Sequence, residues 1–191
     1  MKLIIKYNGY LDDITKAYCL TIPKYAERAA QTTVMEVVEE KTAEFREVWD
    51  RIGNKVIKAI EEKSKRNFPY SIVHVHLVKV IHRTQAESMI FPYNTTADEF
   101  ASYLIHELCH LSGYTHTPDF AEKYKNENIS VRQHIIINAM IEYIFRDILT
   151  RVDYLEKEKS RGQKHSNDTY TNAWKIVEEE GYKHILDTYI K

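Results

Sequence analysis

Cysteines and long apolar runs are scarce in this chain, and their scarcity excludes several classes of protein. The 191 residues include two cysteines, Cys19 and Cys109, too few for the disulfide framework of a small secreted domain. No stretch approaches the roughly 18 consecutive apolar residues of a membrane-spanning helix. The N-terminal segment MKLIIKYNGYLDD reaches charged residues too soon for a signal peptide. We therefore expect a soluble, cytoplasmic protein that does not enter a membrane.

The chain also has almost no net charge. Lys plus Arg number 27 and Asp plus Glu number 28, so bulk charge predicts no strong attraction to nucleic acid or to anionic membranes. The one basic run, KEKSRGQKH at residues 157–165, is more typical of a solvated linker between helices. Hydrophobic residues make up 43% of the chain, which is enough for the core of a single globular domain.

The N-terminal third predicts a strand pair followed by a long helix. Residues 3–10, LIIKYNGY, are typical of a strand that runs into an Asn-Gly turn at residues 8–9. The segment AYCLTI at residues 17–22 is the candidate partner strand. Apolar residues at spacings of three, four or seven predict a helix over about 25–65, kinked or split by the Gly-Asn pair at residues 53–54.

The middle of the chain predicts two strands in front of one amphipathic helix. Residues 70–82 alternate β-branched and polar side chains, and residues 87–94 indicate a second strand. Thr95 or Thr96 can cap the next helix, which should end near Gly113. This order predicts an α+β fold that is mostly helical, with a small sheet preceding that helix.

The C-terminal part predicts three more helices. The first begins at Thr117 and Pro118, a capping residue followed by a proline suited to the first helical position. A nearly all-apolar helix should run from about 130 to 151. The last is predicted around 174–189, interrupted or bent by Gly181.

The helix near the centre of the chain carries the sequence HELCHLSGYTH at residues 106–116. Each helical residue advances about 100°, so Phe100 and the leucines share one apolar quadrant, while His106 and His110 lie together on another face. Two imidazoles on successive turns can bind one tetrahedral Zn²⁺ ion. Glu107 then lies where it can reach a water molecule on the metal as a general base.

Two residues after the helical part of the motif extend the metal hypothesis. Gly113 can adopt a positive φ, which ends the helix and turns the chain. This turn would bring His116 back toward a metal held by His106 and His110. The pattern HExxHxxGxxH therefore predicts zinc ligands at His106, His110 and His116 and a catalytic Glu107.

The stretch ADEFASYLIHELCHLSGYTHTPDF resembles the zincin metallopeptidases, especially the SprT-like, WLM and YgjP-like group. The matching residues are His106, Glu107, His110, His116 and Phe120. The resemblance covers about residues 70–125. It implies a zincin-like fold, with a single metallopeptidase-like domain over 1–191 and helical extensions of unknown role at 24–66 and 130–190.

The resemblance also implies an activity, namely zinc-dependent hydrolysis of peptide bonds in a protein or peptide substrate. Glu107 would take a proton from the attacking water and return it to the leaving amine. The strand at 87–94 would hold the substrate by its edge. An oxyanion donor is expected, and Tyr114, the histidines and the backbone are alternatives. The alternative function is a catalytically silent, metal-stabilised binding or regulatory protein of the same fold.

A polar stripe on the apolar helix at 130–151 offers other candidates for the site. His134, Asn138 and Glu142 follow one another at intervals of four residues. On a helix that is apolar nearly all round, such groups must meet either water or a polar site. Glutamate-ligand zincins carry a glutamate on such a downstream helix, so Glu142 is a rival to His116 as third ligand. Asn138 or His134 could then orient a ligand.

The remaining histidines predict no second metal centre. His74 and His76 alternate with valines, which favours the polar outer face of a half-buried strand over a metal site. His82, His165 and His184 form no constellation with other candidate ligands.

Overall fold

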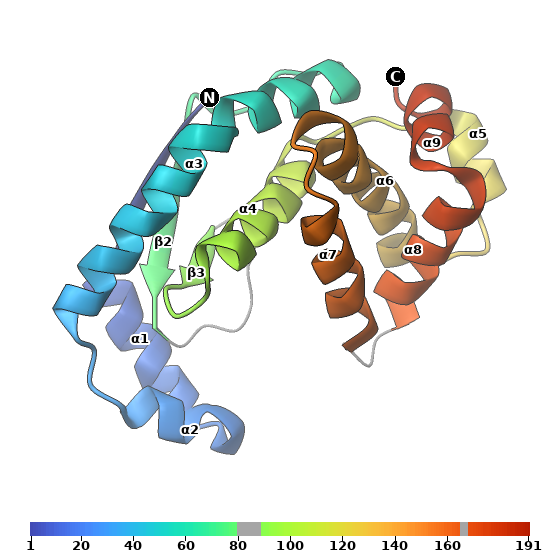
Figure 1. The fold of residues 1–191 in the computed structure, drawn as a ribbon. Helices are drawn as coiled ribbons and strands as arrows, with labels where there is room; N and C mark the ends of the chain where they lie inside the picture. Colours follow the sequence, from blue (N-terminus) through green and yellow to red (C-terminus); the bar gives the residue numbers. More distant parts are fainter. Residues whose placement is uncertain (80–88, 165–167) are drawn as a thin grey trace. The chain divides into compact units, whose positions relative to one another are not determined.

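The computed structural model describes residues 1–79, 89–164 and 168–191, without the side chains of 161–164 and 168. Figure 1 shows that helices make up most of the described chain. Contacts divide the chain into two compact units. Unit 1 comprises Met1–Arg51 and Tyr70–Glu107, and unit 2 comprises Ile52–Pro69 and Leu108–Lys191. The assignment of 1–191 to one metallopeptidase-like domain stays a prediction.

Unit 1 is built on a parallel sheet. Its described strands are β1 (Lys2–Tyr7), β2 (Ile72–Val78) and β3 (Ile90–Pro92), in the order β1-β2-β3. In β2, Val73, Val75 and Leu77 are buried while His74 is exposed, the alternation expected of a strand with one covered face. The α+β class, mostly helical with a small sheet before the motif helix, is confirmed. The predicted strand residues 80–82 and 87–88 lie outside the described residues.

The predicted hairpin at the N-terminus is wrong. Residues 9–20 form α1 (Gly9–Leu20), and β1 pairs with β2 instead, with Lys2 opposite Ile72 and Tyr7 opposite Leu77. Asn8 caps α1, since its Oδ1 accepts a hydrogen bond from the Leu11 backbone N–H at 3.1 Å. Asn-Gly suits both a tight turn and a helix start, and the helix forms because its buried positions recur at helical spacing.

The long helix of the N-terminal half begins later than predicted and is not broken. Residues Pro23–Ala30 form a separate helix, α2, and α3 runs without interruption over Met35–Ser64. Gly53 is buried within α3. A helical glycine costs only about 1 kcal/mol relative to alanine, so the packed apolar positions on either side hold the helix together.

Asp12 joins several segments of unit 1. This α1 side chain is 1% exposed, and its Oδ1 accepts the backbone N–H of Lys79 at 2.6 Å. Its Oδ2 accepts the hydroxyls of Tyr7 at 2.8 Å and Thr33 at 3.2 Å. Burial, followed by this contact with Asp12, raises the pKa of Tyr7. Asp12 therefore holds β1, the end of β2 and the segment before α3 around one carboxylate.

Unit 2 is helical in its described residues. It contains the last part of α3, the end of α4 (Ala97–Leu111), and five complete elements. These are α5 (Pro118–Lys123), α6 (Ile129–Tyr143) with its π-helical continuation η1 (Ile144–Ile148), α7 (Val152–Lys164), α8 (Asp168–Glu180) and α9 (Tyr182–Tyr189). α6 is central to this unit: it packs against α8 and α9, and every residue from 134 to 142 is buried. No helix in the described ranges has both the length and the apolar character needed to cross a membrane.

The C-terminal helix boundaries are partly as predicted. Thr117 caps α5 with Pro118 at its first position, and Gly181, with φ of 83°, separates α8 from α9. The basic run at 157–165 is not a linker, because residues 157–164 belong to α7. Lys159, within this run, contacts α8: its Nζ lies 2.7 Å from Glu178 Oε1 and over the Trp174 ring. His165, like His82, lies outside the described residues.

We predict that Asp12→Ala lowers the free energy of unfolding by about 3–5 kcal/mol, because removing one partner leaves the others of a buried network unsatisfied. Urea denaturation followed by far-UV circular dichroism measures this change. Asp13→Ala, at the exposed neighbouring position, is the matched control and should change stability by no more than about 0.5 kcal/mol. Equal losses in the two variants would contradict the role given to Asp12.

Candidate metal centre

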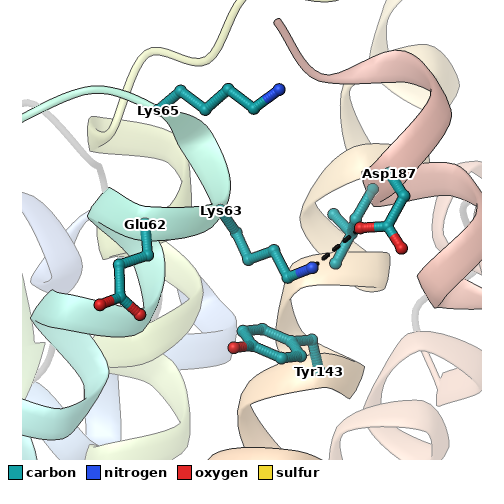
Figure 2. Close-up of a pocket in the computed structure, with 6 residues that line it drawn as sticks. Glu62, Lys63, Lys65, Tyr143 and Asp187 are labelled. Carbon is teal, nitrogen blue, oxygen red and sulfur yellow. Dashed lines mark hydrogen bonds and ion pairs between the residues drawn. The ribbon is translucent and has the colours of Figure 1, made fainter.

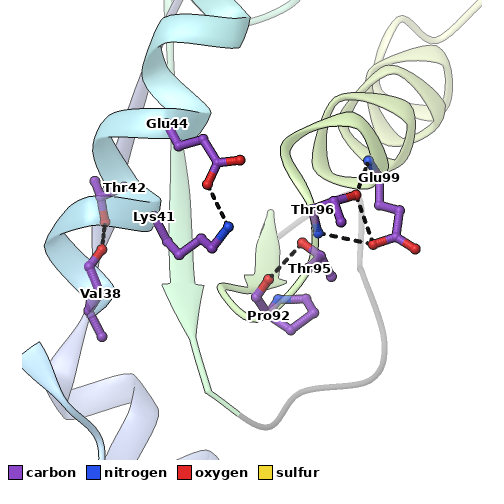
Figure 3. A network of polar contacts seen from close by, with 8 residues as sticks. All are labelled: Val38, Lys41, Thr42, Glu44, Pro92, Thr95, Thr96 and Glu99. Atoms are coloured by element: carbon purple, nitrogen blue, oxygen red, sulfur yellow. Dashed lines mark hydrogen bonds and ion pairs between the residues drawn. The ribbon is translucent and has the colours of Figure 1, made fainter. Parts of the chain in front are cut away.

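Helix α4 carries the HExxH motif, and side-chain hydrogen bonds cap its first turn. The Thr96 Oγ1 accepts the Glu99 backbone N–H at 3.2 Å, and Glu99 Oε2 accepts the Thr96 N–H at 3.0 Å, as Figure 3 shows. This reciprocal capping box confirms the predicted helix start and selects Thr96 as the cap. Thr95 instead donates its hydroxyl to the carbonyl of Pro92 in β3 at 3.2 Å. The start of α4 is thereby fixed to the end of the strand before it.

The apolar face predicted for α4 is buried, and on the predicted histidine face His106 is buried while His110 is half-buried. On the apolar side, Phe100, Leu104 and Leu108 are 0% exposed. On the other side, His106 is 3% and Glu107 6% exposed. A buried imidazole beside a buried carboxylate must be compensated by polar partners or by a metal. His106 and Glu107 on the motif part of α4 are therefore not part of a solvated surface.

A third histidine joins the pair on α4. Among the described residues, His106, His110 and His134 form one group in which a ring nitrogen from each lies within 4.8 Å of the others. Within unit 2, the rings of His110 and His134 are 5.1 Å apart, edge to face at 76°. His134 comes from α6, so the group combines one turn of α4 with the buried helix downstream.

The ring of His134 is held in one orientation. Its Nδ1 lies 2.7 Å from the backbone carbonyl oxygen of Ser130. A carbonyl oxygen can only accept, so Nδ1 carries the proton and a neutral ring has its lone pair on Nε2. The Tyr170 ring of α8 packs against the same imidazole at 4.4 Å. This is the support that metal-ligating histidines usually have, a carbonyl on the far nitrogen that sets the tautomer.

His116, the predicted third ligand, lies outside this histidine group. Gly113 does adopt the expected positive φ, 61°, and ends α4. The chain then places His116 in a backbone bridge with Ile190, with an exposed side chain whose ring lies 5.0 Å from that of Phe120. The turn therefore positions His116 against α5 and the end of α9, all within unit 2.

The rival ligand Glu142 and the candidate oxyanion donor Tyr114 have other partners. Glu142 Oε1 accepts a hydrogen bond from Arg146 Nε at 2.7 Å, and Glu142 is 6% exposed. The Tyr114 hydroxyl donates to the carbonyl of Gln133 at 2.9 Å, and burial raises the pKa of this phenol. Both side chains are therefore engaged in hydrogen bonds within unit 2.

The pair His74 and His76 is a feature of the sheet. Their rings lie 6.1 Å apart and nearly parallel, and the Asn8 amide donates to His76 Nδ1 at 3.2 Å. Burial lowers the pKa of His76, which favours its neutral form. In the described ranges no third histidine, cysteine or carboxylate comes within ligand distance of this pair, as expected for a polar outer face.

Unit 2 also contains a polar pocket of about 250 Å³, shown in Figure 2. Its lining residues are Glu62, Lys63, Lys65, Tyr143, Leu186 and Asp187. Lys63 crosses it, with Nζ 2.8 Å from Asp187 Oδ1 and over the Tyr143 ring at 5.1 Å. The two lysines and two acids balance in charge, so the pocket selects neither anions nor cations.

The histidine group fits zinc. Three imidazole nitrogens are a donor set typical of that ion. Nitrogens on one tetrahedral zinc lie about 3.3 Å apart, given Zn–N distances of about 2.0–2.1 Å. The three ring nitrogens, which lie within 4.8 Å of one another, are near that spacing. Three protein ligands leave a fourth position for a reactant, as catalytic zinc sites do.

Comparisons with protein-family models, with curated proteins and with solved structures find no match to this chain. The resemblance to zincins therefore depends on the motif residues, and a function has to be argued from the geometry of the site.

We predict that His134→Ala weakens Zn²⁺ binding by at least about 100-fold, because losing even an outer partner of a ligand costs 10–100-fold. His116→Ala is the matched control and should change the affinity by less than about threefold. Competitive titration against a chromogenic zinc chelator at neutral pH measures both. If His116→Ala loses the metal while His134→Ala keeps it, the predicted HExxHxxGxxH ligand set is correct and the histidine group is not.

Proposed function

We propose that this protein is a zinc-dependent peptidase in which His106, His110 and His134 hold the metal and Glu107 is the general base. The observation that carries the proposal is the group of three imidazoles, together with the buried side chain of Glu107, the residue that follows His106 on α4. In glutamate-ligand zincins a downstream helix supplies the third ligand as Glu. Here α6 supplies His134, and we propose a zincin-like site of that arrangement.

Each residue of the site has a defined task. Zinc, when bound, lowers the pKa of a water molecule and polarises the peptide carbonyl. Glu107 would take a proton from the attacking water as the water oxygen adds to the carbonyl carbon, and would deliver that proton to the nitrogen as the C–N bond breaks.

The proposed substrate is an extended segment of protein or peptide. β3 is an edge strand of the described sheet and directly precedes α4. Met89 O and Tyr93 N bond to β2, so the backbone N–H and C=O of Ile90 point to the free side. Main-chain pairing at this edge would hold a substrate with little side-chain selectivity. The balanced net charge gives no support for a nucleic-acid partner.

We expect Glu107→Gln to lower kcat for an unfolded protein substrate by about 10²–10⁴, since glutamine keeps the shape but cannot accept the proton. Zinc content, measured by elemental analysis, should stay at the wild-type value. The measurement is chelator-sensitive cleavage of a casein-type substrate. Glu122→Gln, the same change at an exposed position of α5, should retain full activity.

Two outcomes would contradict the proposal. Cleavage by Glu107→Gln at the wild-type rate would show that the base is another group. Wild-type protein that binds zinc but cleaves no substrate would favour the metal-stabilised binding protein instead.

A further inference from the structure

Asn138 is a buried polar residue that is not a member of the histidine group. It follows His134 by one turn on α6 and therefore lies on the same face. The residue is 1% exposed, and its Nδ2 has no hydrogen-bond acceptor among the described residues. Both neighbours on the stripe are engaged: His134 Nδ1 donates to Ser130 O, and Glu142 accepts from Arg146.

A leucine would fill the place of Asn138 at less cost to the fold. Asparagine and leucine have similar shapes, and α6 is otherwise lined with buried isoleucines. A buried donor without an acceptor destabilises the folded state, and a catalytic role is one of the reasons for which native proteins keep such a group. Asn138 therefore indicates an acceptor that arrives with the substrate.

We propose that the Asn138 amide donates a hydrogen bond to the carbonyl oxygen of the scissile peptide as negative charge develops on it. This inference rests on the proposed peptidase function. Residues four apart on a helix have Cβ atoms about 5–6 Å apart, so Asn138 reaches a carbonyl bound next to His134. Because α6 is packed on all sides, the donor is held in place before the reaction, which is how an oxyanion donor acts.

The other donors considered for this role are less suitable. The Tyr114 hydroxyl is held by the Gln133 carbonyl. The Nδ1 proton of His134 is held by Ser130, and its Nε2 faces the metal in the proposed site. Asn138 has a free donor at a buried position, and a carbonyl oxygen is the acceptor that peptide hydrolysis brings.

The test is Asn138→Leu, with Asn138→Ala as a second variant that cannot overfill the position. We expect kcat to fall by about 10²–10³, the usual loss on removing one oxyanion donor, with KM and zinc content unchanged. The urea midpoint of the chelator-treated Leu variant should be equal to or above that of wild type, because an unpaired donor is removed. Asn172→Leu, at an exposed site on α8, is the matched control and should keep wild-type kcat.

The results separate this inference from the function on which it rests. Wild-type kcat in both Asn138 variants, at full zinc content, would overturn the inference and leave the peptidase proposal intact. A lower urea midpoint with loss of zinc would assign Asn138 a structural role and overturn it as well. If the wild-type protein cleaves nothing, the proposed function fails and this inference fails with it.

Discussion

A helix buried on nearly all sides carries polar side chains at a cost unless each finds a partner, and three polar side chains of α6 are buried: His134, Asn138 and Glu142. An unsatisfied buried group costs about 1–3 kcal/mol, a large part of the stability of a typical domain. His134 meets Ser130 and the ring of His110, and Glu142 meets Arg146. The predicted alternative of a solvent-facing stripe is therefore wrong. Asn138 Nδ2, in contrast, has no acceptor among the described residues, so the protein satisfies the polar face of α6 only in part.

The parts of the structure that local chemistry determines could be predicted from the sequence. The capping box of Thr96 and the Thr117-Pro118 start depend on contacts within one turn, and both form as the residue types indicate. The break at Gly181 follows from its positive φ. The amphipathic pattern likewise predicts that His106 and His110 share a face of α4. These features need no knowledge of distant segments.

The parts that depend on long-range packing could not be predicted. Residues 3–7 of the strand predicted over 3–10 do form a strand, but its partner lies far along the chain in a parallel pairing that no local signal indicates. The same limit applies to the site. The sequence places His134 in a polar stripe, but its position near His106 and His110 follows only from the packing of α6. Gly113 makes the expected turn, but contact with Ile190 and Phe120 decides where that turn leads.

We propose that one metal ion is held by imidazoles from α4 and α6. Crystals of the zinc-loaded protein, measured on both sides of the zinc absorption edge, test it most directly because anomalous scattering locates the ion independently of the protein atoms. We expect a single strong peak for a zinc ion bound by His106, His110 and His134, with the Glu107 carboxylate near the ion and not coordinated to it. A peak bound by His116 or Glu142 in place of His134, or no peak at this histidine group, would contradict it.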